Sequence, residues 1–228
     1  SRTAGYTLNE ENNTATGVTV TPSNKLPEGI VKTETGYEIQ SATGLSNLAA
    51  LVNGGKDFAG ETIVLADNMN LEGIAWTPIG NCSRKETSGA AFRGTFNGNG
   101  KVISNLNCTL DADDFGAGLF GLLDGATIKN VTIDSGEISN NVDCAGAICG
   151  VMVGESVIEN CKNTGAKIVG ASAAGGIAGR AYGASNTIKE CTNSAEVNGA
   201  AKVGGIVGIA SNNGTTLIES CNNSGNVY

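Results

Sequence analysis

The chain of 228 residues contains 34 Gly, 26 Asn and 7 Cys, has no His, and carries a formal net charge of −8. The missing His excludes a Ser-His-Asp triad, a Cys-His catalytic pair and an imidazole ligand for zinc. No apolar run approaches the roughly 18 residues of a membrane-spanning helix, and the negative charge disfavours a nucleic-acid partner.

The charge is unevenly distributed along the chain. Residues 145–228 carry five acidic and five basic side chains, so the whole net charge lies in residues 1–144. We interpret this acidity as a solubilising surface, because net charge affects solubility more than fold. The hydrophobic content of 40% is enough to build a packed core.

The N-terminal part divides into a polar segment and the first ordered elements. Residues 1–35 lack a period, and we expect a leader at 1–16 and a cap strand at 18–20. The absence of an initial Met and of a signal peptide is typical of a mature or trimmed chain. Strands are expected at 37–39 and 61–65.

One helix is predicted between these strands, at residues 44–55. Leu45, Leu48, Leu51 and Val52 share one helical face. Ser41 or Thr43 would cap its start, and Gly54 would end it. Such a helix could cover the open end of a stack of repeats.

Two further segments precede the repeats. Residues 92–106 resemble a degenerate coil, with Ile103 expected under Ile128 and Leu106 under Val131. The Gly-Asn-Gly at 98–100 is a tight turn and not a phosphate loop, because no helix signal follows it. Trp76, in a small and apolar stretch before a Pro, is expected to pack in the core or cap.

The C-terminal half contains four repeats. Four glycines recur every 29 residues and four isoleucines every 30: Gly121, Gly150, Gly179 and Gly208; Ile128, Ile158, Ile188 and Ile218. The apolar runs between Gly, Asn and Ser are too short for helices, so each unit predicts one coil of a parallel β-helix with about three short strands. Adjacent coils would lie about 4.8 Å apart.

These elements suggest a simple domain organisation. We expect a leader and cap strand at 1–35 and a single β-helix domain at 36–228. Within that domain, residues 36–116 would form the capping helix and irregular coils, and residues 117–228 the four repeats.

The Gly-Leu-Phe-Gly at 118–121, with its degenerate copies and the preceding segments 76–80 and 92–100, resembles the GLUG repeat of bacterial cell-surface and secreted proteins. The resemblance covers about residues 36–228. It implies an all-β, right-handed parallel β-helix with an N-terminal cap, and a role in adhesion or as a stalk. Such repeats also occur in secreted peptidases that cleave immunoglobulin A, but their zinc site contains His, so only the scaffold transfers to this chain.

Two sets of residues recur at one position in three successive coils, and both are expected to be structural ladders. Cys161, Cys191 and Cys221 predict buried free thiols; a disulfide or a thiolate metal site are the alternatives, although zinc prefers four converging ligands. Asn163, Asn193 and Asn223 predict amides bonded along the stack, with ligand contact as the alternative. The other cysteines, which lack C-x-x-C spacing, are Cys82, Cys108, Cys144 and Cys149. Several free thiols in an exported protein indicate a reducing or anaerobic habitat.

The densest acidic cluster comprises Asp111, Asp113 and Asp114. Its carboxylates are a candidate Ca²⁺ site. The cluster lacks the Gly and closing Glu of an EF-hand loop, so a solvated acidic loop is the favoured interpretation.

We expect a non-catalytic adhesion or binding module, secreted or on the outer face of a bacterium and lipid-anchored through an upstream segment. Its ligand would be a host or environmental glycan or protein, without cofactor or catalytic residues. The alternative is a polysaccharide-active lyase or glycosidase, or an inactive relative, for which clustered carboxylates would be needed. A ligand-free spacer is the third hypothesis. The last coil, ending at Val227 and Tyr228, would leave strand edges open to end-to-end association.

Overall fold

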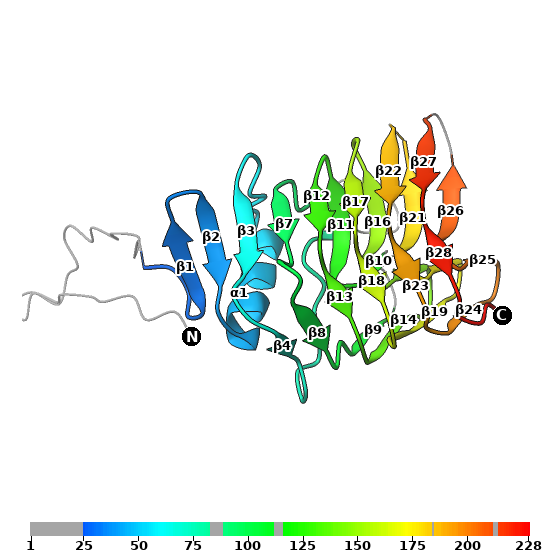
Figure 1. The fold of residues 1–228 in the computed structure, drawn as a ribbon, viewed down its shortest axis with the longest axis horizontal. Coiled ribbons are helices and arrows are strands. Elements are labelled where there is room, and N and C mark those ends of the chain that lie inside the picture. The colour runs from blue at the N-terminus through cyan, green and yellow to red at the C-terminus, as the bar shows by residue number, and fades with distance from the viewer. Residues whose placement is uncertain (1–24, 83–88, 112–115, 184, 212–213) are drawn as a thin grey trace, which may run out of the picture.

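The repeats form a stack of parallel coils in the computed structural model, which describes residues 25–82, 89–111, 116–183, 185–211 and 214–228 (Figure 1). The largest sheet runs along the whole stack and is parallel except between its first two strands. Its members are β1 (Ile30–Thr33), β2 (Gly36–Ile39), β3 (Thr62–Leu65), β7 (Thr95–Asn97), β12 (Thr127–Lys129), β17 (Val157–Glu159), β22 (Asn186–Lys189) and β27 (Thr216–Glu219).

Four other sheets complete the coils. The second sheet contains β4 (Met69–Asn70), β8 (Val102–Ser104), β13 (Thr132–Ile133), β18 (Lys162–Asn163), β23 (Thr192–Asn193) and β28 (Asn222–Asn223). The third contains β9 (Cys108–Leu110), β14 (Glu137–Asn140), β19 (Lys167–Gly170) and β24 (Val197–Gly199). The fourth contains β10 (Gly116–Ala117), β15 (Cys144–Gly146), β20 (Ala173–Gly175) and β25 (Lys202–Gly204). The fifth contains β11 (Phe120–Asp124), β16 (Cys149–Val153), β21 (Ala178–Tyr182) and β26 (Val207–Ser211).

A short antiparallel pair, β5 (Asn81–Cys82) and β6 (Gly89–Ala90), lies outside these sheets. The segments 18–20 and 1–16 lie outside the described residues. No helix among the described residues is long and apolar enough to span a membrane.

Equivalent inward-facing residues stack into ladders that form the core. In the largest sheet, Phe96, Ile128, Ile158 and Ile188 lie in register and are buried. Their neighbours along each strand are more accessible, as the alternating faces of a strand require. Toward the N-terminus the core becomes aromatic, and the Phe92 and Phe120 ring centroids lie 5.2 Å apart.

The predicted register of the degenerate coil is wrong. Ile103 pairs with Ile133, and the residue that pairs with Ile128 is Phe96. The cause is the strand assignment: Ile103 lies on β8 in the second sheet, whereas the strand of this coil that pairs with β12 is β7, before the turn at 98–101. The tight turn itself is confirmed, since Asn99 and Gly100 have positive φ and Lys101 N donates to Gly98 O at 2.8 Å.

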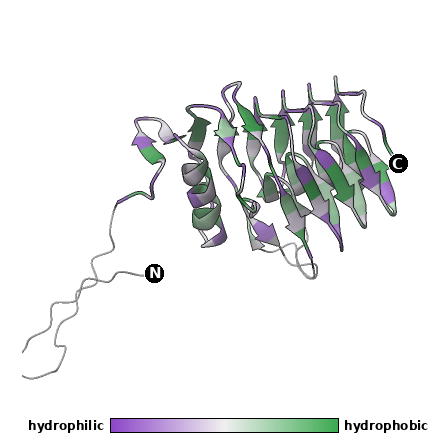
Figure 2. Cartoon of the chain, turned by 90° about the horizontal axis from the view of Figure 1, so that it is seen from below, coloured by the Kyte–Doolittle hydropathy of each residue, from purple (hydrophilic) through white to green (hydrophobic). Residues whose placement is uncertain are grey.

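The N-terminal end of the stack is covered by a helix, α1 (Ala42–Asn53) (Figure 2). The side chain of Ser41 caps it by accepting from Gly44 N at 3.1 Å. Leu45, Leu48 and Val52 are buried in the core. The expected fold class, a parallel β-helix whose N-terminal cap contains one short helix, is therefore confirmed.

The motif glycines let the fourth and fifth sheets approach each other closely. A Cβ added at Gly150 would overlap the Cα of Gly116, and one at Gly179 would lie 2.8 Å from Ala145 N. These glycines are thus required by backbone packing between coils.

Candidate functional site

A shallow groove of about 370 Å³ crosses three successive coils where the third sheet turns into the fourth. Its lining consists of amide, small, aliphatic and aromatic side chains: Asn140, Asn141, Val169, Gly170, Ala171, Asn198, Gly199, Ala200 and Tyr228. Most of these residues occupy equivalent positions in their coils, because Asn140, Gly170 and Gly199 lie in register. The groove is therefore oriented along the solenoid axis.

Differences in turn length produce the depression. Three residues separate Asn140 from Cys144 in one coil. In the next coil, only two residues separate the equivalent positions, Gly170 and Ala173. The longer turn is held by Asn140, whose Oδ1 accepts from Val142 N at 3.0 Å and Asp143 N at 2.8 Å. It forms one end of the groove.

Small residues keep the floor of the groove low. A Cβ at Gly170 would overlap Ala173 O, and a Cβ at Gly199 would lie 2.7 Å from Val203 Cγ2. Packing at the turn thus requires glycine at both positions. Because these positions share a strand face with the buried Ile168 and Val197, a side chain there would point into the turn, and the floor consists of the glycine backbone together with Ala171 and Ala200.

Tyr228 closes the opposite end on a fixed backbone. Its N–H donates to Val197 O at 2.9 Å, and its carbonyl accepts from Gly199 N at 3.2 Å. The bridge between Val197 and Val227 places Tyr228 beside Asn198, and its side chain is 65% exposed. An accessible aromatic ring is thus held next to a row of small residues.

The groove lining carries no charged side chain, and the carboxylates beside it already have partners. Asn198 Nδ2 donates to Glu196 Oε1 at 2.6 Å, and Lys167 Nζ lies 3.3 Å from the same oxygen. The Asn198 amide and then Lys167 lower the pKa of Glu196. On the other side, Asn141 Nδ2 donates to Asp111 Oδ1 at 2.6 Å. The site offers amide oxygens and an aromatic ring, a chemistry suited to binding neutral polar groups.

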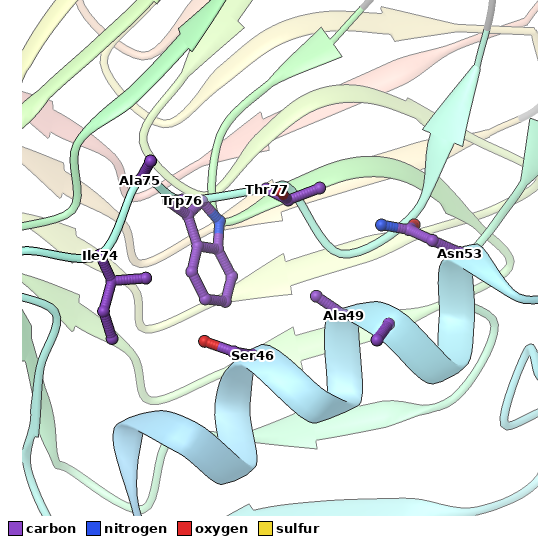
Figure 3. A pocket seen from close by; sticks show the side chains of 8 residues that line it. Ser46, Ala49, Asn53, Ile74, Ala75, Trp76 and Thr77 are labelled. Atoms are coloured by element: carbon purple, nitrogen blue, oxygen red, sulfur yellow. The ribbon is translucent and has the colours of Figure 1, made fainter. Parts of the chain in front are cut away.

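A second hollow, of about 280 Å³, lies between α1 and residues 74–77 (Figure 3). Its polar groups serve the cap: Trp76 Nε1 donates to Gly118 O and Leu119 O, both at 3.2 Å, and Asn53 Nδ2 donates to Pro78 O at 3.0 Å. Trp76 is only 4% exposed, so its predicted core position is confirmed. The hollow arises because Ala49 and Ala50 do not fill the space facing the indole.

The predicted thiol ladder is present. Cys161 and Cys191 are buried and Cys221 is half-buried, and all three are free. Each thiol donates to the carbonyl two residues before it, at 3.2–3.3 Å. The other described cysteines, Cys108, Cys144 and Cys149, are also buried, while the side chain of Cys82 lies outside the described part.

The Asn163, Asn193 and Asn223 side chains stack as predicted, but they bond mainly to their own turns. Asn163 Nδ2 donates to Ala166 O and Asn193 Nδ2 to Ala195 O, both at 2.9 Å. Asn193 Nδ2 also donates along the stack to Asn223 Oδ1 at 2.8 Å. Asn163 and Asn193 are fully buried, which leaves them no surface for a ligand.

A further asparagine ladder was not predicted. Asn130 Nδ2 donates to Asn97 Oδ1 at 2.9 Å, and Asn160 Nδ2 donates to Asn130 Oδ1 at 2.8 Å. Asn130 and Asn160 have positive φ, which Asn tolerates better than most residues. Their spacing of 30 residues was the signal that could have revealed them.

Of the candidate Ca²⁺ ligands, Asp111 is described and is bonded to Asn141, whereas Asp113 and Asp114 lie outside the described residues. Within the part of the chain that the structure covers, no three His, Cys, Asp or Glu residues gather as a metal site would require.

No protein-family model matches this chain, and no curated protein is significantly similar to it. Among solved structures it resembles one described as a "putative immunoglobulin A1 protease" from Bacteroides ovatus, with a TM-score of 0.68 and 24% identity. The match covers 86% of this chain and 59% of that one, so this chain spans little more than half of its structural neighbour. At this identity the likeness concerns the fold.

Proposed function

We propose that this protein is a non-catalytic binding module of a bacterial surface or secreted protein, built on a β-helix scaffold of the GLUG-repeat type. The uncharged groove across three coils is the observation that carries this proposal. It combines an exposed aromatic ring with amide groups on a rigid backbone, which is how binding sites achieve contact area at low entropic cost.

Enzymatic cleavage of a polysaccharide is the alternative. It would require two carboxylates placed on either side of a bound sugar. The carboxylates that the lining asparagines contact, Glu196 and Asp111, are instead bonded to Asn198 and Asn141, and Asp143 in the turn at the end of the groove is buried and accepts from Cys144 Sγ at 3.1 Å. This arrangement supports binding over catalysis.

Surface location follows from the same proposal. The sequence resemblance and the structural neighbour from Bacteroides both favour a protein that acts outside the cytoplasm. An upstream lipid anchor would hold the module at the cell surface, with its ligand a glycan or protein of the host or environment.

A binding screen separates the three hypotheses. The labelled protein in solution would be applied to arrays of host and plant glycans and of matrix proteins, and each glycan that binds would then be incubated in solution with the protein. Saturable binding without new reducing ends supports the binding module. Release of reducing ends would establish an enzyme, and silence on every array would favour a spacer.

A further inference from the structure

We infer that the groove binds a neutral, extended polysaccharide whose chain lies along the solenoid axis. This inference rests on the proposed binding function and adds the class and direction of the ligand. The spacing of the coils, the absence of charged side chains from the lining and the position of Tyr228 support it.

The spacing of the groove favours a glycan over a peptide. Outward-facing positions of the lining recur once per coil, since Val169 lies in register with Asn198 and Asn198 lies beside Tyr228, and strands in a sheet lie about 4.8 Å apart. A hexose in an extended chain advances by a similar distance, so successive sugars would meet equivalent positions. An extended peptide rises about 3.3 Å per residue and presents the same face only at every second residue, which does not match the coil spacing.

The absence of charged lining residues favours a neutral polymer. A carboxylate or sulfate group in the groove would be partly desolvated without a cationic partner. Lys167, on the same strand as the lining residues Val169 and Gly170, has its Nζ 3.3 Å from Glu196 Oε1 and is therefore already paired. Sugar hydroxyls, in contrast, can donate to the side-chain oxygens of Asn198 and Asn141, whose nitrogens donate to carboxylates.

Tyr228 supplies the apolar surface that a sugar ring needs. Its ring is exposed, its backbone is bonded on both sides to β24, and no other aromatic residue lines the groove. The less polar face of a pyranose could stack on this ring, while its hydroxyls reach the amides. Tyrosine is suited to such a contact because it is apolar in the body and polar at the tip.

Calorimetric titration with neutral oligosaccharides tests the inference. The probes are cello-, manno-, xylo- and chito-oligosaccharides of two to six units, with oligogalacturonates of the same lengths as the charged comparison. In at least one neutral series, affinity should rise with length and level off once the chain spans the three coils. Oligogalacturonates should bind at least tenfold more weakly. Length-independent affinity, or stronger binding of the charged series, would overturn the inference.

Three variants assign any binding to the groove. Tyr228→Ala should weaken binding at least tenfold, and Ala200→Arg, which puts a bulky side chain on the exposed floor, should abolish it. Tyr182→Ala removes an aromatic ring from β21 and should leave affinity unchanged. Unchanged affinity in Tyr228→Ala and Ala200→Arg would refute the assignment. Array binding that no neutral oligosaccharide inhibits would refute the inference but leave the proposed function intact, whereas silent arrays would refute both.

Discussion

The three thiols of the cysteine ladder differ in how many neighbouring coils cover them. Cys161 and Cys191 each have a coil above and below, whereas Cys221 belongs to the last coil. Burial raises the pKa of Cys161 well above its ordinary value of 9.0. Burial also raises the pKa of Cys221, which nevertheless retains accessible surface. Because a reagent must also reach the sulfur, reactivity should follow exposure along the ladder.

Thiol titration of the native protein checks this gradient. Replacement of Cys221 by Ser should remove one thiol from the set that reacts with an aromatic disulfide reagent before unfolding. Replacement of Cys161 by Ser should leave that set unchanged, and the total should fall by one only in denaturant. Loss of a native-state thiol in Cys161→Ser would contradict the described burial.

Identical residues at equivalent positions of different strands contribute unequally to the free energy of unfolding. Ile158 and Ile218 occupy the same ladder, but Ile158 is buried and Ile218 is 44% exposed. We expect Ile158→Ala to lower the free energy of unfolding by about 2–5 kcal/mol, since it leaves a cavity. Ile218→Ala should cost roughly 1 kcal/mol or less because part of its surface is already hydrated. Denaturant titration of both variants measures the difference, and equal losses would show that the last coil is covered in solution.

The close contact between β16 and β10 requires glycine at position 150. A Cβ at Gly150 would meet backbone atoms of Gly116 that cannot move without separating two strands. Gly183 has a φ of 76° but open space around it.

We therefore expect Gly150→Ala to destabilise the protein by about 3 kcal/mol, the upper end of the usual cost of overpacking, because the added Cβ meets backbone atoms. Gly183→Ala should cost only about 1 kcal/mol of backbone strain. Thermal and denaturant unfolding compare the two variants, and a mild effect of Gly150→Ala would mean that the two sheets can separate without loss.

The whole molecule has two unlike ends. At the N-terminal end, α1 covers the core and β1 pairs antiparallel with β2. At the other end, the apolar side chains of Leu217 and Ile218 are 53% and 44% exposed. In a linear stack each coil is stabilised by its neighbours, so the terminal coil with one neighbour should open first.

Hydrogen exchange tests this polarity. Amides of β27 and β28 should exchange faster than those of β17 and β18, which are the same elements two coils earlier. The rates should not depend on protein concentration if the last coil is free. Protection of β27 that increases with concentration would instead support the end-to-end association proposed from the sequence.

Much of this architecture was determined by the sequence alone. The recurrence of glycine, isoleucine, cysteine and asparagine predicted the coils and both proposed ladders, because stacking places residues one period apart directly over one another. The capping helix was predicted as well, since its leucine spacing and its Ser41 cap are local signals. The register of residues 92–106 was not, because Ile103 and Leu106 have the same spacing as Ile128 and Val131 although they lie one strand later in their coil, and only the pairing of the strands distinguishes the two positions.

The groove was decided only by the tertiary structure. Its floor combines Gly170 and Gly199, which the local packing requires, and its end is formed by Tyr228, which lies far from Asn140 in the chain. None of these residues belongs to a functional motif, and each becomes part of a site only when three coils of unequal turn length stack. The period of a solenoid sequence fixes which residues form ladders. The hollows on its surface depend on where successive coils differ in turn length, and such a difference produces a groove only when the coils are stacked in the folded protein.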